Sequence, residues 1–193
     1  MVRSILVSVV ALGLYASSAL AAPLAADGKY SLDPDHTNIG FEVSHMGVSF
    51  VVGRFDKKSG TVQLVANGAT QISVQIDASS VDTNVAQRDT HLRSADFFNV
   101  AQFPTASYVS TKVDYDNNGN PKTVTGNLTL HGVTKPVVLT VSPIGTAVDQ
   151  TNATRVGFHA TAQIKRSDFG MNNLLAIAGD DITLTLNIEA IKQ

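Results

Sequence analysis

Residues 156–164, VGFHATAQI, carry an apolar side chain at every second position. Side chains that alternate with a period of two lie on one face of a β-strand, so this stretch predicts a strand with one apolar and one solvated face. Residues 37–45 (TNIGFEVSH), 71–78 (QISVQIDA) and 181–190 (DITLTLNIEA) repeat the pattern. Further runs that fit a strand lie at about 48–55, 60–66, 106–115, 122–130 and 136–146.

Turn signals lie between these runs: KKSG (57–60), ANGA (66–69), NNGN (117–120), HGVTK (131–135) and VDQTNA (148–153). Short connections join antiparallel strands, so the pattern predicts an all-β protein of eight or nine antiparallel strands. Strands that are apolar on one face close into a barrel or stack as a sandwich. Periodicity alone does not choose between these two architectures.

Composition limits the function classes. The 193 residues are 44% hydrophobic, which is enough for one compact domain with a full core. The formal charge is −2 and the Lys and Arg residues are scattered, so we expect no nucleic-acid partner. There is no cysteine, which excludes thiol catalysis and thiolate zinc sites.

The first residues, MVRSILVSVVALGLYASSALA (1–21), have the pattern of a signal peptide. A cation at Arg3 precedes an apolar run from Ile5 to Leu14, and small residues end at Ala21. We expect cleavage after Ala21, a domain spanning 22–193, and a periplasmic or secreted protein. An uncleaved anchor is the alternative, but the apolar run is shorter than the ~20 residues that a transmembrane helix needs.

Residues 79–105 break the alternation and are too long for a hairpin loop. Within them, VAQRDTHLR (85–93) predicts a short helix, with Asn84 as its cap and Gln87 completing a capping box. Asp89 and Arg93 have the i,i+4 spacing of a surface ion pair. We expect this helix to lie across one end of the β-structure.

Charged and aromatic residues gather in this connection. Arg88 and His91 are one helical turn apart, and Phe97, Phe98 and Phe103 follow closely. A charged helix beside aromatic residues indicates the mouth of a cavity, with a polar rim and an apolar throat. A structural role for His91 remains open.

Four blocks of the sequence resemble the YceI-like family, over about residues 28–191. They are HTNIGFEVSHMGVSFVVGRF (36–55), RDTHLRSADFFNVAQFPTASY (88–108), GNLTLHGVTKPVVLTV (126–141) and GFHATAQIKRSDFGM (157–171). The resemblance implies an eight-stranded, lipocalin-like antiparallel β-barrel with a short helix in the 79–105 connection. It also implies a cavity that holds a long apolar molecule, typically a polyisoprenoid, in an exported and often dimeric protein that needs no cofactor.

We therefore expect the chain to bind, carry or sequester a long-chain lipid such as a prenyl phosphate or prenyl quinone, without chemical turnover. Burial of each CH₂ group contributes about 0.8 kcal/mol, so the tail alone can give useful affinity. The residues expected to contact the tail are Ile39, Phe41, Val43, Phe50, Val52, Phe97, Phe98, Phe103, Leu128, Leu130, Phe158, Phe169 and Leu184. Those expected to contact a head group are Arg88, His91, Arg93 and Arg166, since arginine can donate two hydrogen bonds to one phosphate.

Other functions remain open. A barrel packed solid with side chains would have no cavity, and such a protein would act through its outer strands, in a stress response for example. A metal-dependent enzyme is a weaker alternative, because the sequence has neither a G-x-S-x-G nor an H-E-x-x-H motif. A calcium-loop pattern begins at Asp114 but has Thr125 where the bidentate Glu belongs. We expect no bound metal.

Overall fold

The computed structural model describes residues 27–65 and 70–193. The expected signal peptide (1–21) and the expected turn at 66–69 lie outside the described residues. The strands are β1 (Gly28–Leu32), β2 (Asn38–His45), β3 (Ser49–Phe55), β4 (Lys58–Leu64), β5 (Gln71–Asp77), β6 (Val81–Asp82), β7 (Thr105–Tyr115), β8 (Pro121–Leu130), β9 (Val133–Val148), β10 (Thr154–Lys165) and β11 (Ala178–Lys192). The helices are α1 (Ala86–Arg93) and two 3₁₀ turns, η1 (Ala78–Ser80) and η2 (Arg166–Phe169).

Three of the barrel strands are interrupted. β1 and β2 both pair with β11, and the turn at residues 33–37 separates them. In the same way β4 pairs with β1 while β3 pairs with β2, and the short β6 continues β5 by pairing with β3. When β1 with β2, β3 with β4, and β5 with β6 are each counted as one interrupted strand, the described residues form eight antiparallel strands.

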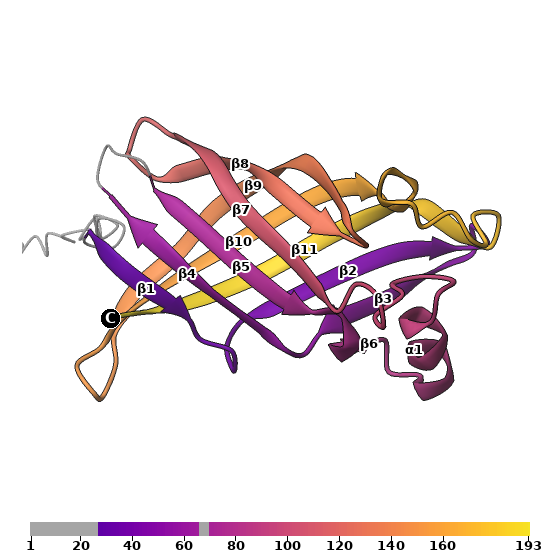
Figure 1. The fold of residues 1–193 in the computed structure, drawn as a ribbon. Helices are drawn as coiled ribbons and strands as arrows, with labels where there is room; N and C mark the ends of the chain where they lie inside the picture. The colour runs from indigo at the N-terminus through magenta and orange to yellow at the C-terminus, as the bar shows by residue number, and fades with distance from the viewer. Residues whose placement is uncertain (1–26, 66–69) are drawn as a thin grey trace, which may run out of the picture.

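The eight strands close into a barrel in chain order. Neighbours follow one another from β4 through β5, β7, β8, β9 and β10 to β11, and β1 pairs with both β4 and β11. Figure 1 shows the elongated barrel that results, with α1 beside one end. The prediction of an eight-stranded antiparallel barrel with a short helix in the 79–105 connection is confirmed. The short β1 and β6 were not predicted, because they have too few residues for an alternation to stand out.

The register explains which side chains face inward. Residues directly opposite each other on antiparallel strands share a face of the sheet. Phe158 of β10 lies opposite Ile188, and Ala160 lies opposite Leu186 of β11. The alternation predicted for 156–164 and 181–190 therefore places both apolar faces on the same side of the sheet, toward the barrel interior.

The connection between β5 and β7 leaves the barrel wall. The helix begins after Val85, one residue later than predicted, and has no side-chain cap. Asn84 has a φ of 64°, in the left-handed region that asparagine tolerates, so the predicted capping box is wrong. Leu92 and Phe98 pack on the core that Tyr30, Phe55 and other buried side chains form. Within the described residues, no helix reaches the length and apolar character of a membrane-spanning segment.

Candidate functional site

The barrel contains an apolar cavity with a volume of about 640 Å³. This lies within the roughly 300–1,000 Å³ that small-molecule sites occupy. Aliphatic and aromatic side chains from nearly every strand line it, together with residues of α1 and of the loop that follows. A barrel packed solid with side chains is therefore contradicted by the structure.

Most of the residues proposed for ligand contact line this cavity. Of those expected to contact the tail, the cavity wall contains Ile39, Phe41, Val43, Phe97, Phe98, Leu128, Leu130, Phe158 and Leu184. Of those expected to contact a head group, it contains Arg88, His91 and Arg166. Their location is consistent with ligand contact, which stays a prediction.

Phe50 and Val52 do not line the cavity, and their predicted position was wrong. Both lie in β3, where Phe50 is opposite Ser44 and Val52 is opposite Glu42 of β2. They therefore share the outer face with these polar residues and are 66% and 63% exposed. Val51, which lies opposite Val43, is the inward residue of this part of β3.

Three further predicted positions were wrong. The Phe103 ring packs against the His131 ring, with 4.7 Å between their centroids, outside the cavity wall. Phe169 is buried in the core beside Tyr108 and Met171 rather than at the cavity surface. Arg93 donates hydrogen bonds from Nε to the Ser79 carbonyl at 2.7 Å and from Nη2 to the Val81 carbonyl at 2.7 Å. The Arg93 side chain therefore links α1 to η1 and β6 by hydrogen bonds.

Several lining residues were not predicted. Leu32, Phe55, Val62, Leu64, Ile72, Val74, Ile76, Tyr108, Val137, Val141, Leu186 and Ile188 belong to this group. Many lie on strand faces that the alternation predicts to be apolar, so their alternating positions in the sequence could have identified them. Met171 and Leu174 could not have been found in this way, because they lie in a loop without alternation.

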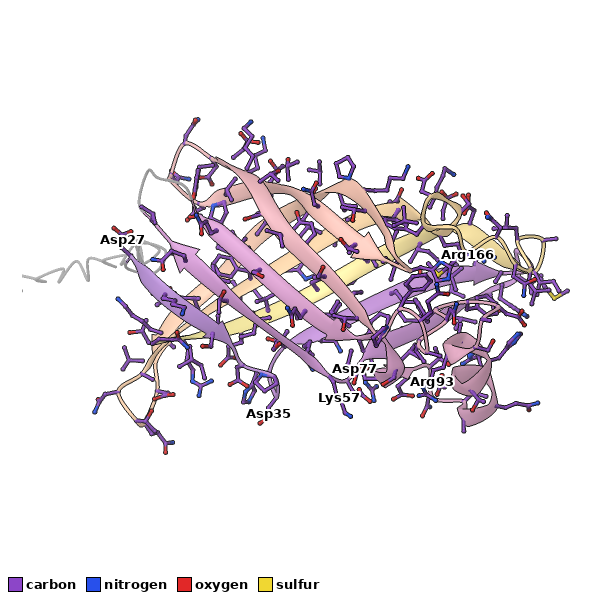
Figure 2. The ribbon with its side chains drawn as sticks, in the orientation of Figure 1. Asp27, Asp35, Lys57, Asp77, Arg93 and Arg166 are labelled. Carbon is purple, nitrogen blue, oxygen red and sulfur yellow. The ribbon has the colours of Figure 1, made fainter. Side chains whose placement is uncertain are left out.

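The cavity extends along the barrel between two polar ends. Asp27, Thr70, Tyr115 and Asn118 line one end, and His45, Arg88, His91 and Arg166 line the other. Figure 2 shows Asp27 and Arg166 at opposite ends of the barrel. The apolar middle and the polar ends suit a molecule with a long apolar chain.

Arg166 is buried at the end of the cavity nearest α1. Its Nε, Nη1 and Nη2 atoms donate to the carbonyls of Gly179 at 2.9 Å, Met171 at 2.8 Å and Ala178 at 2.7 Å. Its guanidinium carbon lies 5.7 Å from the centre of the Phe97 ring. Burial lowers the pKa of Arg166 below its usual value. Arg166 therefore holds the loop between β10 and β11 against the aromatic residues that follow α1.

Arg88 is held differently. It donates from Nε to the Thr83 hydroxyl at 2.7 Å and from Nη2 to the Thr83 carbonyl at 2.6 Å. Its Nη1 donates no hydrogen bond to the described residues, and the side chain lines the cavity. Of the two cavity arginines, Arg88 is therefore the one with a nitrogen that makes no hydrogen bond to the described residues.

Asp89 accepts no hydrogen bond from Arg93, contrary to the predicted surface pair. The Asp89 side chain is buried and accepts from the Thr83 backbone N–H at 2.9 Å and from the Thr83 hydroxyl at 2.5 Å. His91, in contrast, lies 2.9 Å from Asp96 through Nε2, and its ring packs nearly perpendicular to the Phe97 ring. The structural role left open for His91 is consistent with these contacts.

Tyr108 places a polar group in the apolar wall. Its hydroxyl lies 3.0 Å from the Val124 carbonyl and 3.3 Å from the Val137 carbonyl, and donates to this pair. Burial raises the pKa of Tyr108 to about 12, so the phenol stays neutral. Gly126 makes the position possible, because a Cβ atom there would collide with the Tyr108 ring.

Among the described residues, one cluster of potential metal ligands is present, and it lies outside the cavity. Asp33, His36 and Glu189 have ligand atoms within 4.8 Å of one another. Arg155 already donates from Nη1 to Asp33 at 2.6 Å and to Glu189 at 2.6 Å. This cation balances the carboxylates where a metal ion would have to bind, so the cluster is better described as an ion-pair network that joins β10 and β11 to the turn after β1.

Comparison with known proteins identifies the fold family. The chain matches the family described as YceI-like domain over residues 30–190. The UPF0312 protein of Pseudomonas aeruginosa (strain LESB58) is 41% identical over 172 residues, which are 88% of this chain and 89% of that protein. The crystal structure of the Campylobacter jejuni YCEI protein is 31% identical, has a TM-score of 0.68, and is matched over 84% of this chain and 96% of that one. A polyisoprenoid binding domain from Saccharophagus degradans, implicated in plant cell wall breakdown, shares the fold at 19% identity with a TM-score of 0.64, over 85% of this chain and 98% of that one.

Proposed function

This chain belongs to the YceI-like family, and from that premise we propose that it binds a long-chain isoprenoid lipid in its barrel cavity. The observation that carries the proposal is the apolar cavity that extends along the barrel. A structure with the same fold is named a polyisoprenoid binding domain, which agrees with the kind of ligand proposed. Transfer of an apolar chain from water into such a cavity is favourable in proportion to the area buried.

The ligand lies with its head group at the end of the cavity nearest α1. Arg88 and His91 line that end, and a phosphate could accept from the remaining nitrogen of Arg88. Arg166 is less suited to this role, because its three nitrogens all donate to backbone carbonyls. An uncharged head group such as a quinone would need only a single donor there.

The protein acts by sequestering or carrying this lipid rather than by transforming it. Between its polar ends the cavity wall is apolar apart from Tyr108, whereas catalysis needs convergent groups that exchange protons or attack a bond. The role is exercised in the periplasm or outside the cell. The signal-peptide pattern of residues 1–21 supports this location.

Native mass spectrometry of the protein purified from its export compartment tests the proposal, with extraction and identification of any lipid it carries. We expect a discrete adduct that yields a long-chain isoprenoid. Protein that carries no lipid, and that takes up none when a prenyl alcohol or prenyl phosphate is added, would overturn the proposal.

A further inference from the structure

The end of the barrel with the charged and aromatic cavity residues also has an exposed apolar surface. We call it the mouth surface, and it consists of the exposed side chains Met46, Val48, Phe50, Leu174, Leu175 and Ile177. The first three come from the turn between β2 and β3 and from β3 itself, and the others from the loop before β11. A hydrogen bond from the Met46 N–H to the Ile177 carbonyl, 2.8 Å long, joins the two segments.

The mouth surface is continuous with the cavity. Leu174 belongs to both, since it is exposed and also lines the cavity. His45 and Ala178 line the cavity as well, and each is adjacent in the chain to a residue of the mouth surface. An apolar molecule on this surface would therefore reach the cavity past the apolar side chains of Leu174 and Ala178.

Two turns hold large apolar residues in an unfavourable backbone conformation at this mouth. Among the described residues, six that are not glycine have positive φ, and four of them are Asn or His, which tolerate it. The other two are Met46 (φ 53°) and Leu174 (φ 54°), both in the mouth surface. The turn at Met46 and Gly47 has positive φ at both central residues, a geometry in which Asn-Gly is the usual pair. Methionine is more strained than asparagine would be at this position, and it exposes an apolar side chain.

Charge is also absent from the segments that form this surface. Residues 43–53 and residues 169–179 contain no Asp, Glu, Lys or Arg. Two hairpin turns at the opposite end, those after β7 and after β9, are built around Asp116 and Asp149, whose carboxylates accept hydrogen bonds from nearby backbone N–H groups. The two segments of the mouth surface therefore differ in chemistry from these turns, and their uncharged apolar side chains suit contact with the apolar interior of a lipid bilayer.

We propose that the mouth surface docks on a lipid bilayer, so that a lipid passes between the membrane and the cavity without crossing water. The inference rests on the proposed function, because only a protein that collects a membrane lipid needs such a contact. A second copy of the chain is a less suitable occupant, since two mouths packed together would close the path into both cavities. Exposed apolar side chains at the tip of two turns enter the headgroup region of a bilayer and bury their area there.

Flotation with phosphatidylcholine vesicles tests the proposal, using protein expressed from the full chain so that any processing takes place. The test variant is Phe50→Asp and the matched control is Ile144→Asp, because Ile144 lies on the outer face of β9 and is 67% exposed against 66% for Phe50. Wild type and Ile144→Asp should float with the vesicles, and Phe50→Asp should float about tenfold less. High salt should leave flotation unchanged, because the surface is uncharged.

Wild-type protein that stays unbound, or Phe50→Asp that floats as well as Ile144→Asp, would overturn the proposal. So would a dimer, seen by sedimentation velocity, that Phe50→Asp dissociates while no form binds vesicles. Native mass spectrometry on the same samples separates the two proposals. Lipid-loaded protein that does not float contradicts only the docking, whereas lipid-free protein that floats through Phe50 supports the docking and contradicts the proposed function.

Discussion

Thr83 donates two hydrogen bonds to the buried carboxylate of Asp89, one from its backbone N–H and one from its hydroxyl. The same threonine accepts from Arg88 through its hydroxyl and its carbonyl. Thr83 therefore positions two of the charged residues of α1, Arg88 and Asp89, and through them the α1 end of the cavity.

Replacing Asp89 should destabilise the protein more than replacing an exposed acid of the same connection. Asp89→Ala leaves the buried N–H and hydroxyl of Thr83 without their acceptor, which we expect to cost roughly 1–3 kcal/mol of unfolding free energy. Asp96→Ala removes only the exposed contact with His91 and should cost less than about 1 kcal/mol. Urea denaturation measures both. Equal losses would mean that the Thr83–Asp89 contacts do not stabilise the fold.

Arg88→Ala should weaken the binding of a charged ligand more than the binding of a neutral one. The arginine can offer Nη1 to a phosphate, whereas a prenyl alcohol of the same chain length gains little from it. We expect about a tenfold larger loss of affinity for the phosphate, equivalent to a charge-assisted hydrogen bond of roughly 1.5 kcal/mol. Arg93→Ala is the comparison, because Arg93 lies outside the cavity wall. Equal losses for the two ligands would remove Arg88 from the head-group role.

The stability of the barrel should fall in acid partly through Asp33. Burial opposes ionisation, but hydrogen bonds from Arg155 and His36 lower the pKa of Asp33 to about 2, from a usual value of 3.8. A carboxylate whose pKa is lower in the folded than in the unfolded protein stabilises the fold at pH values above its unfolded-state pKa. This stabilisation is lost as the pH falls toward the folded-state pKa. The stabilising effect of Asp33 should therefore disappear between about pH 4 and pH 2.

Asp33→Asn provides the measurement. At neutral pH this substitution should lower the unfolding free energy by roughly 1.5–3 kcal/mol, since it removes charge-assisted hydrogen bonds. The difference in unfolding free energy between wild type and the variant should shrink as pH falls through this window. Other carboxylates with lowered pKa values, Asp77 and Asp180 among them, act in the same direction, so acid should still destabilise the variant. A difference that stays constant down to pH 2 would contradict the assigned role of Asp33.

The inward face of a strand could be predicted from the sequence where apolar and polar residues alternate. This holds for β2, β10 and β11, whose predicted apolar residues line the cavity or belong to the core. It failed at β3, where Phe50, Val51 and Val52 are all apolar and periodicity cannot choose between the faces. Register against β2 decides it, and register depends on the position of the turn at Met46 and Gly47.

The partners of the charged residues could not be predicted in the same way. Spacing along the helix paired Asp89 with Arg93, yet Asp89 accepts from Thr83, while Arg93 donates to the carbonyls of Ser79 and Val81. These are hydrogen bonds to the backbone of an irregular segment. A side-chain pattern contains no information on where the carbonyls of such a segment point, so the tertiary fold has to be known first.

The measurement that tests the central claim most directly is equilibrium binding of a prenyl alcohol to variants that fill the cavity. Ala160 is buried and lines the cavity, whereas Ala147 lies on the exposed part of β9. Ala160→Phe should weaken binding by about tenfold or more, Ala160→Val less, and Ala147→Phe not at all, because only the first two reduce the space for the chain. A wild-type protein that binds the alcohol with the same affinity as a folded Ala160→Phe variant would place the ligand outside the barrel and contradict the account.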